Sequence, residues 1–249
     1  MSRLAPSSPA FSNVCALPDA NRNWERYPPP DGVGIVVRDR RAAPADGAYS
    51  ICYVNAFQTQ PGERAHWPDG LMVQVDGEPL RDPEWPDEFV LDTSSAASRA
   101  RIRTVVRPWI EGCGASGFDA VEFDNLDSYT RSEGQLDIDD NLALATDLVR
   151  IAHEAGLAVA QKNVAEHTAA LHERAGFDFA LVEECAAHDE CQEYSAVYGE
   201  HVIDIEYTDN LPRPFSELCA DENSPTSMVL RDRDLAVPGD DEYVFELCR

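Results

Sequence analysis

The sequence predicts an α/β fold, a (β/α)₈ barrel of the TIM type, and three observations predict it. The chain has 249 residues, a length at which such barrels form a single domain. About eight short apolar runs recur along it, mostly followed by helical stretches. Polar side chains gather at the C-terminal end of nearly every run, the edge where a barrel carries its chemistry. An open doubly wound sheet needs polar ends mainly beside its switch point, so the barrel is preferred.

The first two strands are expected at residues 32–37 and 49–54, where apolar runs end in polar side chains. Only a short connection of Ala, Pro and Gly joins them, so this first unit is abbreviated and has little room for a helix. Residues 1–23 are rich in Ser, Pro, Ala and Asn and lack the apolar run of a signal peptide. They are predicted to form a flexible tail before one barrel domain over residues 24–249.

Residues 59–87 interrupt the alternation of strands and helices, and they are predicted to be an insertion on the face where the strands end. The segment is rich in proline, and residues 75–77 (Val-Asp-Gly) are a hairpin signal. It also contains Trp67 and Trp85. These two rings would either line a groove for sugar rings or fill the small core of the insertion itself.

A third strand is expected at residues 89–91. A long amphipathic helix follows, which begins after Ser94 or Ser95 and ends in the glycine-rich stretch 112–117. Another helix is expected after the acids of residues 137–140, because negative charge stabilises a helix N-terminus. The same acids lack the glycine and the closing glutamate of a calcium-binding loop.

The five remaining strands carry the polar ends on which the functional argument depends. They are expected at residues 120–123, 157–160, 179–182, 202–205 and 228–230. The polar residues that follow them are, in order, Asp124, Asn125 and Asp127; Lys162 and Asn163; Glu183 and Glu184; Glu206 and Tyr207; and Arg231. Lys162 is the only lysine of the chain. In a barrel the ends of neighbouring strands surround one mouth, so these side chains would converge there.

The chain is strongly acidic, with a formal net charge of -26. Nucleic acid and anionic membranes would be repelled and are not expected partners, and no run reaches the roughly 18 apolar residues of a transmembrane helix. The acidity fits a cationic or neutral partner, and it fits a solubilising or salt-adapted surface equally well.

Seven cysteines indicate an oxidising compartment, and the lack of a CxxC pair gives a zinc ribbon little support.

A carboxylate pair from different strands is the apparatus of glycoside hydrolysis, in which one acid protonates the leaving oxygen and the other acts as nucleophile or base. Neighbouring carboxylates push one another's pKa values apart, and Lys162 would keep one of them ionised. Asn163 would hydrogen-bond a substrate hydroxyl. Two other hypotheses stay open: an ion network without chemistry, and an aldolase-like barrel in which Lys162 forms a Schiff base.

Five segments of the chain match the motifs of one known family. They are residues 116–129 (Ser-Gly-Phe-Asp-Ala-Val-Glu-Phe-Asp-Asn-Leu-Asp-Ser-Tyr), 156–163 (Gly-Leu-Ala-Val-Ala-Gln-Lys-Asn), 177–185 (Phe-Asp-Phe-Ala-Leu-Val-Glu-Glu-Cys), 52–55 (Cys-Tyr-Val-Asn) and 202–207 (Val-Ile-Asp-Ile-Glu-Tyr). Together they resemble glycoside hydrolase family 114, the endo-α-1,4-polygalactosaminidases. The resemblance covers roughly residues 49–207.

This resemblance implies a barrel hydrolase that cuts α-1,4-linked galactosamine exopolysaccharide without a metal or an organic cofactor. It implies that Asp124 and Glu183 are the catalytic pair. The side chains expected to bind or orient the sugar are Tyr53, Asn125, Asp127, Lys162, Asn163, Glu206 and Tyr207. The resemblance further implies a local disulfide between Cys185 and Cys191.

Two departures from the family pattern flank Glu183. Val182 and Glu184 stand where family members carry an amide-type residue and Gln, so a contact with the sugar is expected to differ. The family implies an extracellular or cell-surface protein, but no signal peptide is visible and a cytoplasmic location stays open.

The remaining expectations concern substrate and mechanism. A cationic, deacetylated polymer would give the acidity a role in binding. A non-catalytic glycan-binding barrel is a third hypothesis. Glu183 is expected as proton donor and Asp124 as nucleophile or base, while retention or inversion depends on their separation.

Overall fold

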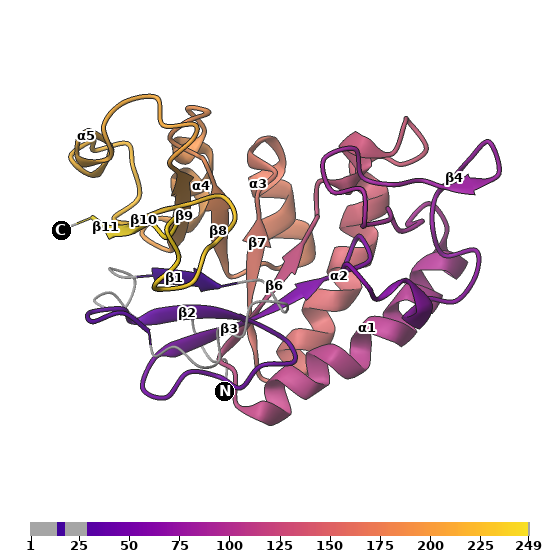
Figure 1. Ribbon diagram of the computed structural model, residues 1–249. Helices are drawn as coiled ribbons and strands as arrows, with labels where there is room; N and C mark the ends of the chain where they lie inside the picture. The colour runs from indigo at the N-terminus through magenta and orange to yellow at the C-terminus, as the bar shows by residue number, and fades with distance from the viewer. Residues whose placement is uncertain (1–13, 18–28, 249) are drawn as a thin grey trace.

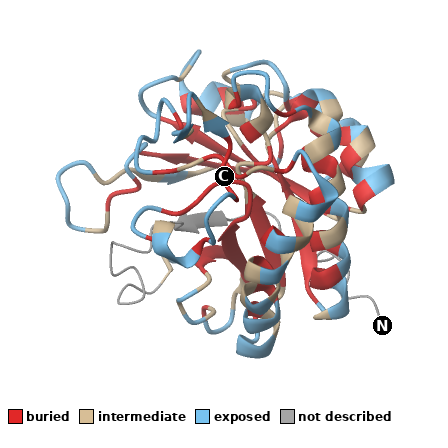
Figure 2. Cartoon of the chain, turned by 90° about the vertical axis from the view of Figure 1, so that its right-hand side faces the viewer, coloured by how far each residue is buried: buried red, intermediate tan, exposed pale blue. Residues whose placement is uncertain are grey.

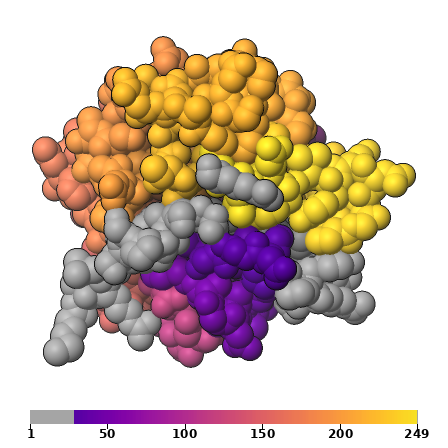
Figure 3. All heavy atoms as spheres, turned by 90° about the vertical axis from the view of Figure 1, so that its left-hand side faces the viewer, coloured from indigo at the N-terminus to yellow at the C-terminus, as the bar shows by residue number. Residues whose placement is uncertain are grey.

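The computed structural model describes residues 14–17 and 29–248 and shows a barrel of parallel strands (Figure 1). The strand order is β1-β2-β3-β6-β7-β8-β9-β10, and β11 adds antiparallel to β10. The strands are β1 (Val14–Leu17), β2 (Ile35–Asp39), β3 (Tyr49–Asn55), β6 (Ala120–Asp124), β7 (Ala158–Lys162), β8 (Phe179–Glu183), β9 (Val202–Tyr207), β10 (Ser227–Arg231) and β11 (Phe245–Leu247). The sheet curls until β1 lies beside β10, and Figure 3 shows the indigo and yellow parts of the chain meeting on one face. The predicted barrel is confirmed.

The start of the barrel differs from the prediction. Residues 89–91 make only isolated antiparallel bridges with the insertion and its flanks, so they are not a barrel strand. The additional strand is β1, which pairs parallel with β2 and falls within residues 1–23, where a tail is predicted. The other residues of that segment lie outside the described part of the chain. The abbreviated unit is confirmed, because residues 40–48 between β2 and β3 contain no helix.

Helices cover the outside of the barrel after β3 (Figure 1). They are α1 (Ala96–Ser116), α2 (Ile138–Glu154), α3 (Thr168–Ala170), α4 (Cys191–Tyr198) and α5 (Phe215–Cys219), with short helical turns η3 (Arg64–His66), η4 (Ser128–Arg131), η5 (Ala165–His167) and η6 (Leu171–Ala175). Figure 2 shows the strands buried and the helices with one buried and one exposed face. The helices therefore shield the outer face of the sheet and leave the strand ends to form the site.

Local signals in the sequence set the ends of the two long helices. The Ser95 hydroxyl accepts a hydrogen bond from the Ser98 N–H at 3.0 Å and starts α1. Gly117, with a φ of 94°, ends α1 in the left-handed conformation that favours glycine. Asp137 and Asp140 form a capping box at the start of α2. The acids of residues 137–140 therefore lie at the start of a helix, as predicted.

Side chains of the strands alternate between two cores. One fills the barrel interior and includes Ile51, Ala120, Ala158, Leu181 and Ile203. The other lies between the strands and the helices around them. Toward the C-terminal ends of the strands, the interior face carries polar side chains instead of apolar ones. They are Tyr53, Glu122, Asp124, Lys162, Glu183 and Tyr207. The alternation that builds the interior core therefore also directs these polar groups into one mouth.

The insertion of residues 59–87 contains the predicted hairpin. β4 (Gln74–Val75) and β5 (Glu78–Pro79) pair antiparallel. Asp76 and Gly77 between them have φ values of 52° and 86°. Two consecutive positive φ values are what a two-residue type I′ turn requires.

The two tryptophans of the insertion have different environments. Trp67 is buried and packs edge-on against Trp109 of α1, with 5.5 Å between the ring centroids. Trp85 is 56% exposed. Trp67 therefore anchors the insertion to α1, whereas Trp85 lies on the surface and fills no core.

Three disulfides join six of the seven cysteines in the described part of the chain. They are Cys52–Cys113, Cys185–Cys191 and Cys219–Cys248. The first joins β3 to α1, and the last joins α5 to the C-terminal segment. The predicted pairing of Cys185 with Cys191 is confirmed. No helix among the described residues combines the length and the apolar character needed to cross a bilayer.

Candidate active site

Lys162, at the end of β7, lies at the centre of three carboxylates. Its Nζ atom is 2.9 Å from Glu122 Oε1, 3.2 Å from Asp124 Oδ1 and 3.4 Å from Glu183 Oε2. The three acids come from β6 and β8, the strands on either side of β7. The structure thus brings Asp124, Lys162 and Glu183 together at one mouth, as the strand alternation predicts.

Two tyrosines bind the carboxylate oxygens of Asp124 and Glu183 that do not face Lys162. The Tyr53 hydroxyl on β3 donates a hydrogen bond to Asp124 Oδ2 at 2.6 Å. The Tyr207 hydroxyl at the end of β9 donates to Glu183 Oε1. Each carboxylate is therefore held by a tyrosine through one oxygen and by Lys162 through the other. Such fixed geometry before substrate arrives is what preorganised catalysis requires.

The ammonium of Lys162 and the hydroxyl of Tyr53 keep Asp124 ionised. Burial raises the pKa of the Asp124 carboxyl, but the Lys162 ammonium and the Tyr53 hydroxyl outweigh burial and hold this pKa below its usual value. Burial lowers the pKa of Lys162, but the surrounding carboxylates outweigh it and hold the pKa well above its usual value. For Glu122 burial dominates and, although Lys162 opposes it, raises the pKa to about 7. At neutral pH Asp124 is negative and Lys162 is positive.

The backbone leaves the sheet in the same uncommon way at three neighbouring strand ends. Asn125, Asn163 and Glu184, which directly follow β6, β7 and β8, have φ values of 62°, 50° and 60°. Non-glycine residues in this region cost free energy and concentrate at functional sites. The turn lets the Asn163 Oδ1 accept a hydrogen bond from the Glu183 N–H at 2.9 Å, and its Nδ2 donate to Glu183 Oε2 at 3.4 Å.

The sequence model of one enzyme family covers nearly all of this chain. It is the model of glycoside-hydrolase family GH114, which matches residues 8–249. The chain belongs to glycoside-hydrolase family GH114. The resemblance carried by the segments around Asp124, Lys162 and Glu183 is confirmed, and the chain is a glycoside hydrolase.

Solved structures share the barrel of this GH114 protein. The crystal structure of Aspergillus fumigatus Ega3 in complex with galactosamine is similar at 20% identity with a TM-score of 0.72, over 100% of this chain and 98% of that one. The glycoside hydrolase domain of PelA from Pseudomonas aeruginosa is similar at 18% identity with a TM-score of 0.60, over 92% of this chain and 98% of that one. None of the curated proteins matches the chain in sequence.

The structure corrects the predicted placement of Glu206 in the mouth of the GH114 barrel. The alternation that turns Tyr207 inward turns Glu206 to the outer face of β9, where it is buried with Asp204. Glu206 Oε1 accepts a hydrogen bond from the Ala186 N–H at 2.8 Å, and Asp204 Oδ1 accepts one from the Cys185 N–H at 3.2 Å. The two acids therefore hold the segment after β8, and a contact of Glu206 with the sugar stays a prediction.

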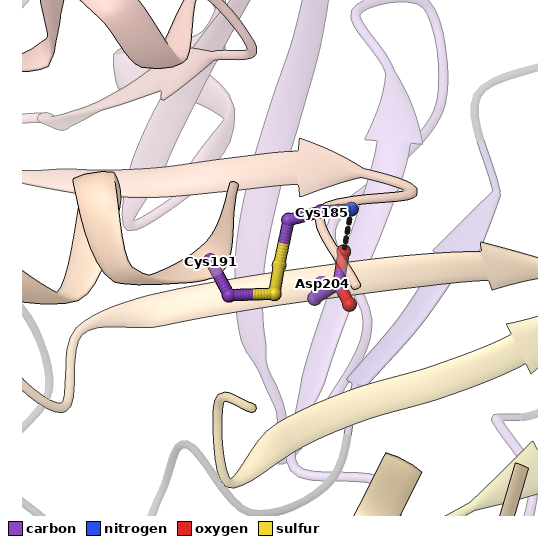
Figure 4. A group of neighbouring side chains, drawn as sticks. All are labelled: Cys185, Cys191 and Asp204. Atoms are coloured by element: carbon purple, nitrogen blue, oxygen red, sulfur yellow. Dashed lines mark hydrogen bonds between the residues drawn. A yellow bond between two sulfur atoms is a disulfide. The ribbon is translucent and has the colours of Figure 1, made fainter. Parts of the chain in front are cut away.

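Asp204 also lies beside the disulfide of that segment, as Figure 4 shows. The sulfur atoms of Cys185 and Cys191 and an oxygen of Asp204 are close enough together to surround a metal ion. However, metal ligation by cysteine requires the thiolate, and these two sulfurs are joined to each other. The group therefore acts as a clamp, in which the disulfide closes the turn and Asp204 holds its backbone.

Asn125 and Asp127 are held at the rim by protein groups. Arg131 donates two hydrogen bonds to the Asp127 carboxylate, at 2.8 and 2.9 Å, and one to Asn125 Oδ1 at 3.0 Å. Asn125 Nδ2 donates to Asn55 Oδ1 at 3.0 Å. Both residues order the loop after β6, and their contact with the sugar stays a prediction.

The departure from the family pattern at Glu184 has a partner in Arg233. Arg233 donates to Glu184 Oε1 and to Asp209 Oδ1, both at 2.8 Å. Its guanidinium lies over the Tyr207 ring, 4.4 Å from the centroid. The loop after β10 is thereby connected to the tyrosine that holds Glu183.

Two acids of the site are absent from the predicted site residues. Glu122 precedes Asp124 by two residues, so strand alternation alone places it on the same face. Glu88 directly follows the insertion, and it lies at the mouth because the insertion folds back onto the barrel. No local pattern in the sequence indicates Glu88, because its neighbours in the fold are distant along the chain.

Proposed function

We propose that this GH114 protein is an endo-acting glycosidase that cuts α-1,4-linked galactosamine polymers, with Asp124 as nucleophile and Glu183 as general acid and base. The observation that carries the proposal is the position of the two carboxylates about the single ammonium of Lys162. They come from different strands and face one mouth, which is the arrangement that glycoside hydrolysis uses.

The separation of the two acids favours retention of configuration. Asp124 Oδ1 and Glu183 Oε2 lie 3.2 and 3.4 Å from the same Nζ atom. The two oxygens are therefore separated by at most about 6.6 Å, whereas inverting enzymes hold their carboxyl groups about 6.5–9.5 Å apart and retaining ones about 5–5.5 Å. Little room is left for a water molecule between one acid and the sugar, as inversion would need.

The proposed reaction has two steps. Ionised Asp124 attacks the anomeric carbon while Glu183 gives its proton to the leaving oxygen, and a glycosyl ester forms. Glu183 then takes a proton from water, whose oxygen attacks the same carbon and releases the Asp124 carboxylate. Lys162 keeps its positive charge throughout and stabilises Asp124 both as the attacking and as the leaving group.

The charge of the molecule supports a cationic substrate. The mouth holds three acids around one ammonium, of which Asp124 is held ionised, and the chain has a net charge of -26. Deacetylated galactosamine polymers are cationic and would be attracted to such a surface. The similar barrel of Ega3 is in complex with galactosamine, which supports the same sugar here.

The Schiff-base hypothesis receives no support from the environment of Lys162. An amine attacks a carbonyl only in its neutral form, and enzymes that use lysine in this way lower its pKa. Here the neighbouring carboxylates hold the pKa of Lys162 well above its usual value. Borohydride is therefore expected to trap no substrate on Lys162.

Hydrolysis of purified polymer by site variants tests the proposal. Asp124→Asn and Glu183→Gln are each expected to abolish cleavage of deacetylated galactosamine polymer while binding persists, whereas Glu193→Gln, an exposed acid on α4, keeps full activity. With an aryl galactosaminide, whose phenolate leaves without protonation, added azide is expected to react with Asp124→Asn to give the inverted glycosyl azide and with Glu183→Gln to give the retained one. Full activity in either site variant removes that residue from the mechanism. Wild-type binding without cleavage would support the glycan-binding barrel instead.

We also place the protein outside the cytosol, in line with its disulfides, which persist in oxidising compartments. Titration of free thiols in the natively isolated, denatured protein is expected to find the six paired cysteines unreactive until a reductant is added. Six reactive thiols without reductant would contradict this location.

A further inference from the structure

Glu88 lies at the mouth of the barrel beside Asp124. Its Oε2 atom accepts hydrogen bonds from Asn55 Nδ2 at 3.0 Å and from Asn125 Nδ2 at 3.3 Å. Asn55 ends β3 and is the register partner of Asp124, and Asn125 directly follows Asp124. Both amides that hold Glu88 therefore belong to immediate neighbours of the proposed nucleophile.

Unlike Asp82 and Glu63, the buried acids of the insertion, Glu88 lacks a cation. Asp82 pairs with Arg131 at 2.7 Å, and Glu63 pairs with Arg41 at 3.3 Å. Glu88 has no ion-pair partner within residues 29–248, and its Oε1 atom accepts no hydrogen bond from these residues. A buried carboxylate without a cation is costly, so Glu88 ionises readily only when a positive group arrives beside it.

The charged groups around Glu88 act mainly against its ionisation. Burial is the largest effect and Asp124 the next, and together with Asp82 they raise the pKa of Glu88 to about 8, although Asn55 and Arg131 oppose them. The Tyr53 hydroxyl, which also feels the charge of Glu88, is neutral. Glu88 is therefore mostly protonated at pH 7 when no ligand is bound.

We propose that Glu88 is a specificity-determining residue that binds the free ammonium group of the galactosamine unit held at Asp124. This inference rests on the proposed function and deepens it. An ammonium supplies both the charge and the N–H donors that Oε1 lacks, whereas an acetamide supplies no charge and is bulkier. Glu88 would thus select deacetylated units at the point of cleavage.

The proposal requires a proton to leave when the substrate binds. The protonated carboxyl of Glu88 becomes a carboxylate paired with the ammonium, and its proton passes to the buffer. Binding a neutral, N-acetylated unit leaves that proton in place. Proton release is therefore a signature of this residue that a purely structural role would not produce.

Calorimetry measures this proton directly. A short deacetylated galactosamine oligosaccharide is titrated at pH 7 into the non-cleaving Glu183→Gln variant, in buffers of different ionisation enthalpy. Release of most of one proton per bound oligosaccharide is expected, and it is expected to disappear in the Glu88→Gln, Glu183→Gln double variant. Asp87→Asn in the same background is the matched control, because it removes an exposed acid next in sequence and should leave the release unchanged.

Cleavage kinetics give the second readout. In the otherwise wild-type enzyme, Glu88→Gln is expected to lower the ratio of kcat/KM for deacetylated over acetylated polymer by about tenfold or more, as the loss of a hydrogen bond to a charged group implies. Glu88→Asp, which keeps a carboxyl, should retain part of the preference.

Two results would overturn the role of Glu88: proton release that persists without it, or a preference that stays the same in Glu88→Gln. Thermal unfolding of each variant shows that the comparison concerns folded protein. If the wild type cleaves neither polymer, the proposed function fails regardless of Glu88. If it cleaves deacetylated polymer while Glu88→Gln keeps the preference, only this inference fails.

Discussion

Lys162 Nζ lies closer to Glu122 Oε1, at 2.9 Å, than to the oxygens of Asp124 and Glu183, at 3.2 and 3.4 Å. The acid nearest to the cation is thus neither of the two proposed catalytic groups. Glu122 lies deeper in the barrel, two residues before Asp124 on the same face. It therefore competes with Asp124 for the charge of Lys162 and helps to set how strongly Asp124 is ionised.

Replacing Lys162 by methionine should move the pH dependence of the enzyme. The ammonium holds the pKa of Asp124 below its usual value, so its loss should raise that pKa and shift the acidic limb of the kcat/KM profile to higher pH. Activity at neutral pH should fall on the order of 100-fold or more, as for loss of one preorganised electrostatic group. Lys162→Arg, which keeps the charge, should retain the position of the limb. An unshifted limb in Lys162→Met would show that the cation does not act on the catalytic acid.

Replacing Glu122 by glutamine should have the opposite effect on the same profile. Without its nearest partner, Lys162 acts more fully on Asp124, so the acidic limb should move to lower pH. The change should also alter stability. The folded-state pKa of Glu122 is raised to about 7, so its contribution is present at low pH and is lost as the pH rises through 7. Urea midpoints at pH 5 and pH 8 should therefore differ less in Glu122→Gln than in the wild type, and an unchanged difference would contradict this assignment.

The variant Glu206→Ala distinguishes a structural role of Glu206 from a role in binding the sugar. Two half-buried N–H groups, those of Ala186 and Ala187, lose the carboxylate that accepts their hydrogen bonds at 2.8 and 3.3 Å. The free energy of unfolding should fall by about 1–3 kcal/mol. Affinity for oligosaccharide, measured by calorimetry in the Glu183→Gln background, should change little. A large loss of affinity with unchanged stability would restore Glu206 to the sugar site.

Two of the disulfides should contribute unequally to stability. Cys52 and Cys113 are 61 residues apart, and Cys185 and Cys191 are 6 apart. Loop-closure entropy in the unfolded chain assigns about 4 kcal/mol to the first and about 2 kcal/mol to the second. Paired Cys→Ser variants, compared by urea unfolding, should follow this order. The reverse order would mean that strain or contacts in the folded state outweigh the chain entropy.

Strand alternation made most of the catalytic centre predictable from the sequence. Asp124, Lys162 and Glu183 each continue the interior face of a short apolar strand, so a period of two places them in one mouth. The same rule allows only one of Glu206 and Tyr207 to face inward. The prediction that both enter the mouth ignored this limit, and the structure turns Glu206 outward.

Local patterns in the sequence could not predict contacts that depend on how a long connection folds. The β1 strand lies in a stretch whose composition is that of a tail, and residues 89–91 have the apolar character of a strand but pair with the insertion. Glu88 meets Asn55 across 33 residues and Asn125 across 37. No periodicity of the sequence indicates these hydrogen bonds, because they depend on where the insertion folds back onto the barrel.

The position of the only lysine has a practical consequence. Because the single lysine side chain of the chain is Lys162, at the centre of the catalytic carboxylates, selective ¹⁵N labelling of lysine would give one side-chain ammonium signal. That signal would come from the centre of the site and from nowhere else. The native protein therefore carries its own spectroscopic reporter, through which ligand occupancy and the charge state of the catalytic acids could be followed without adding a probe.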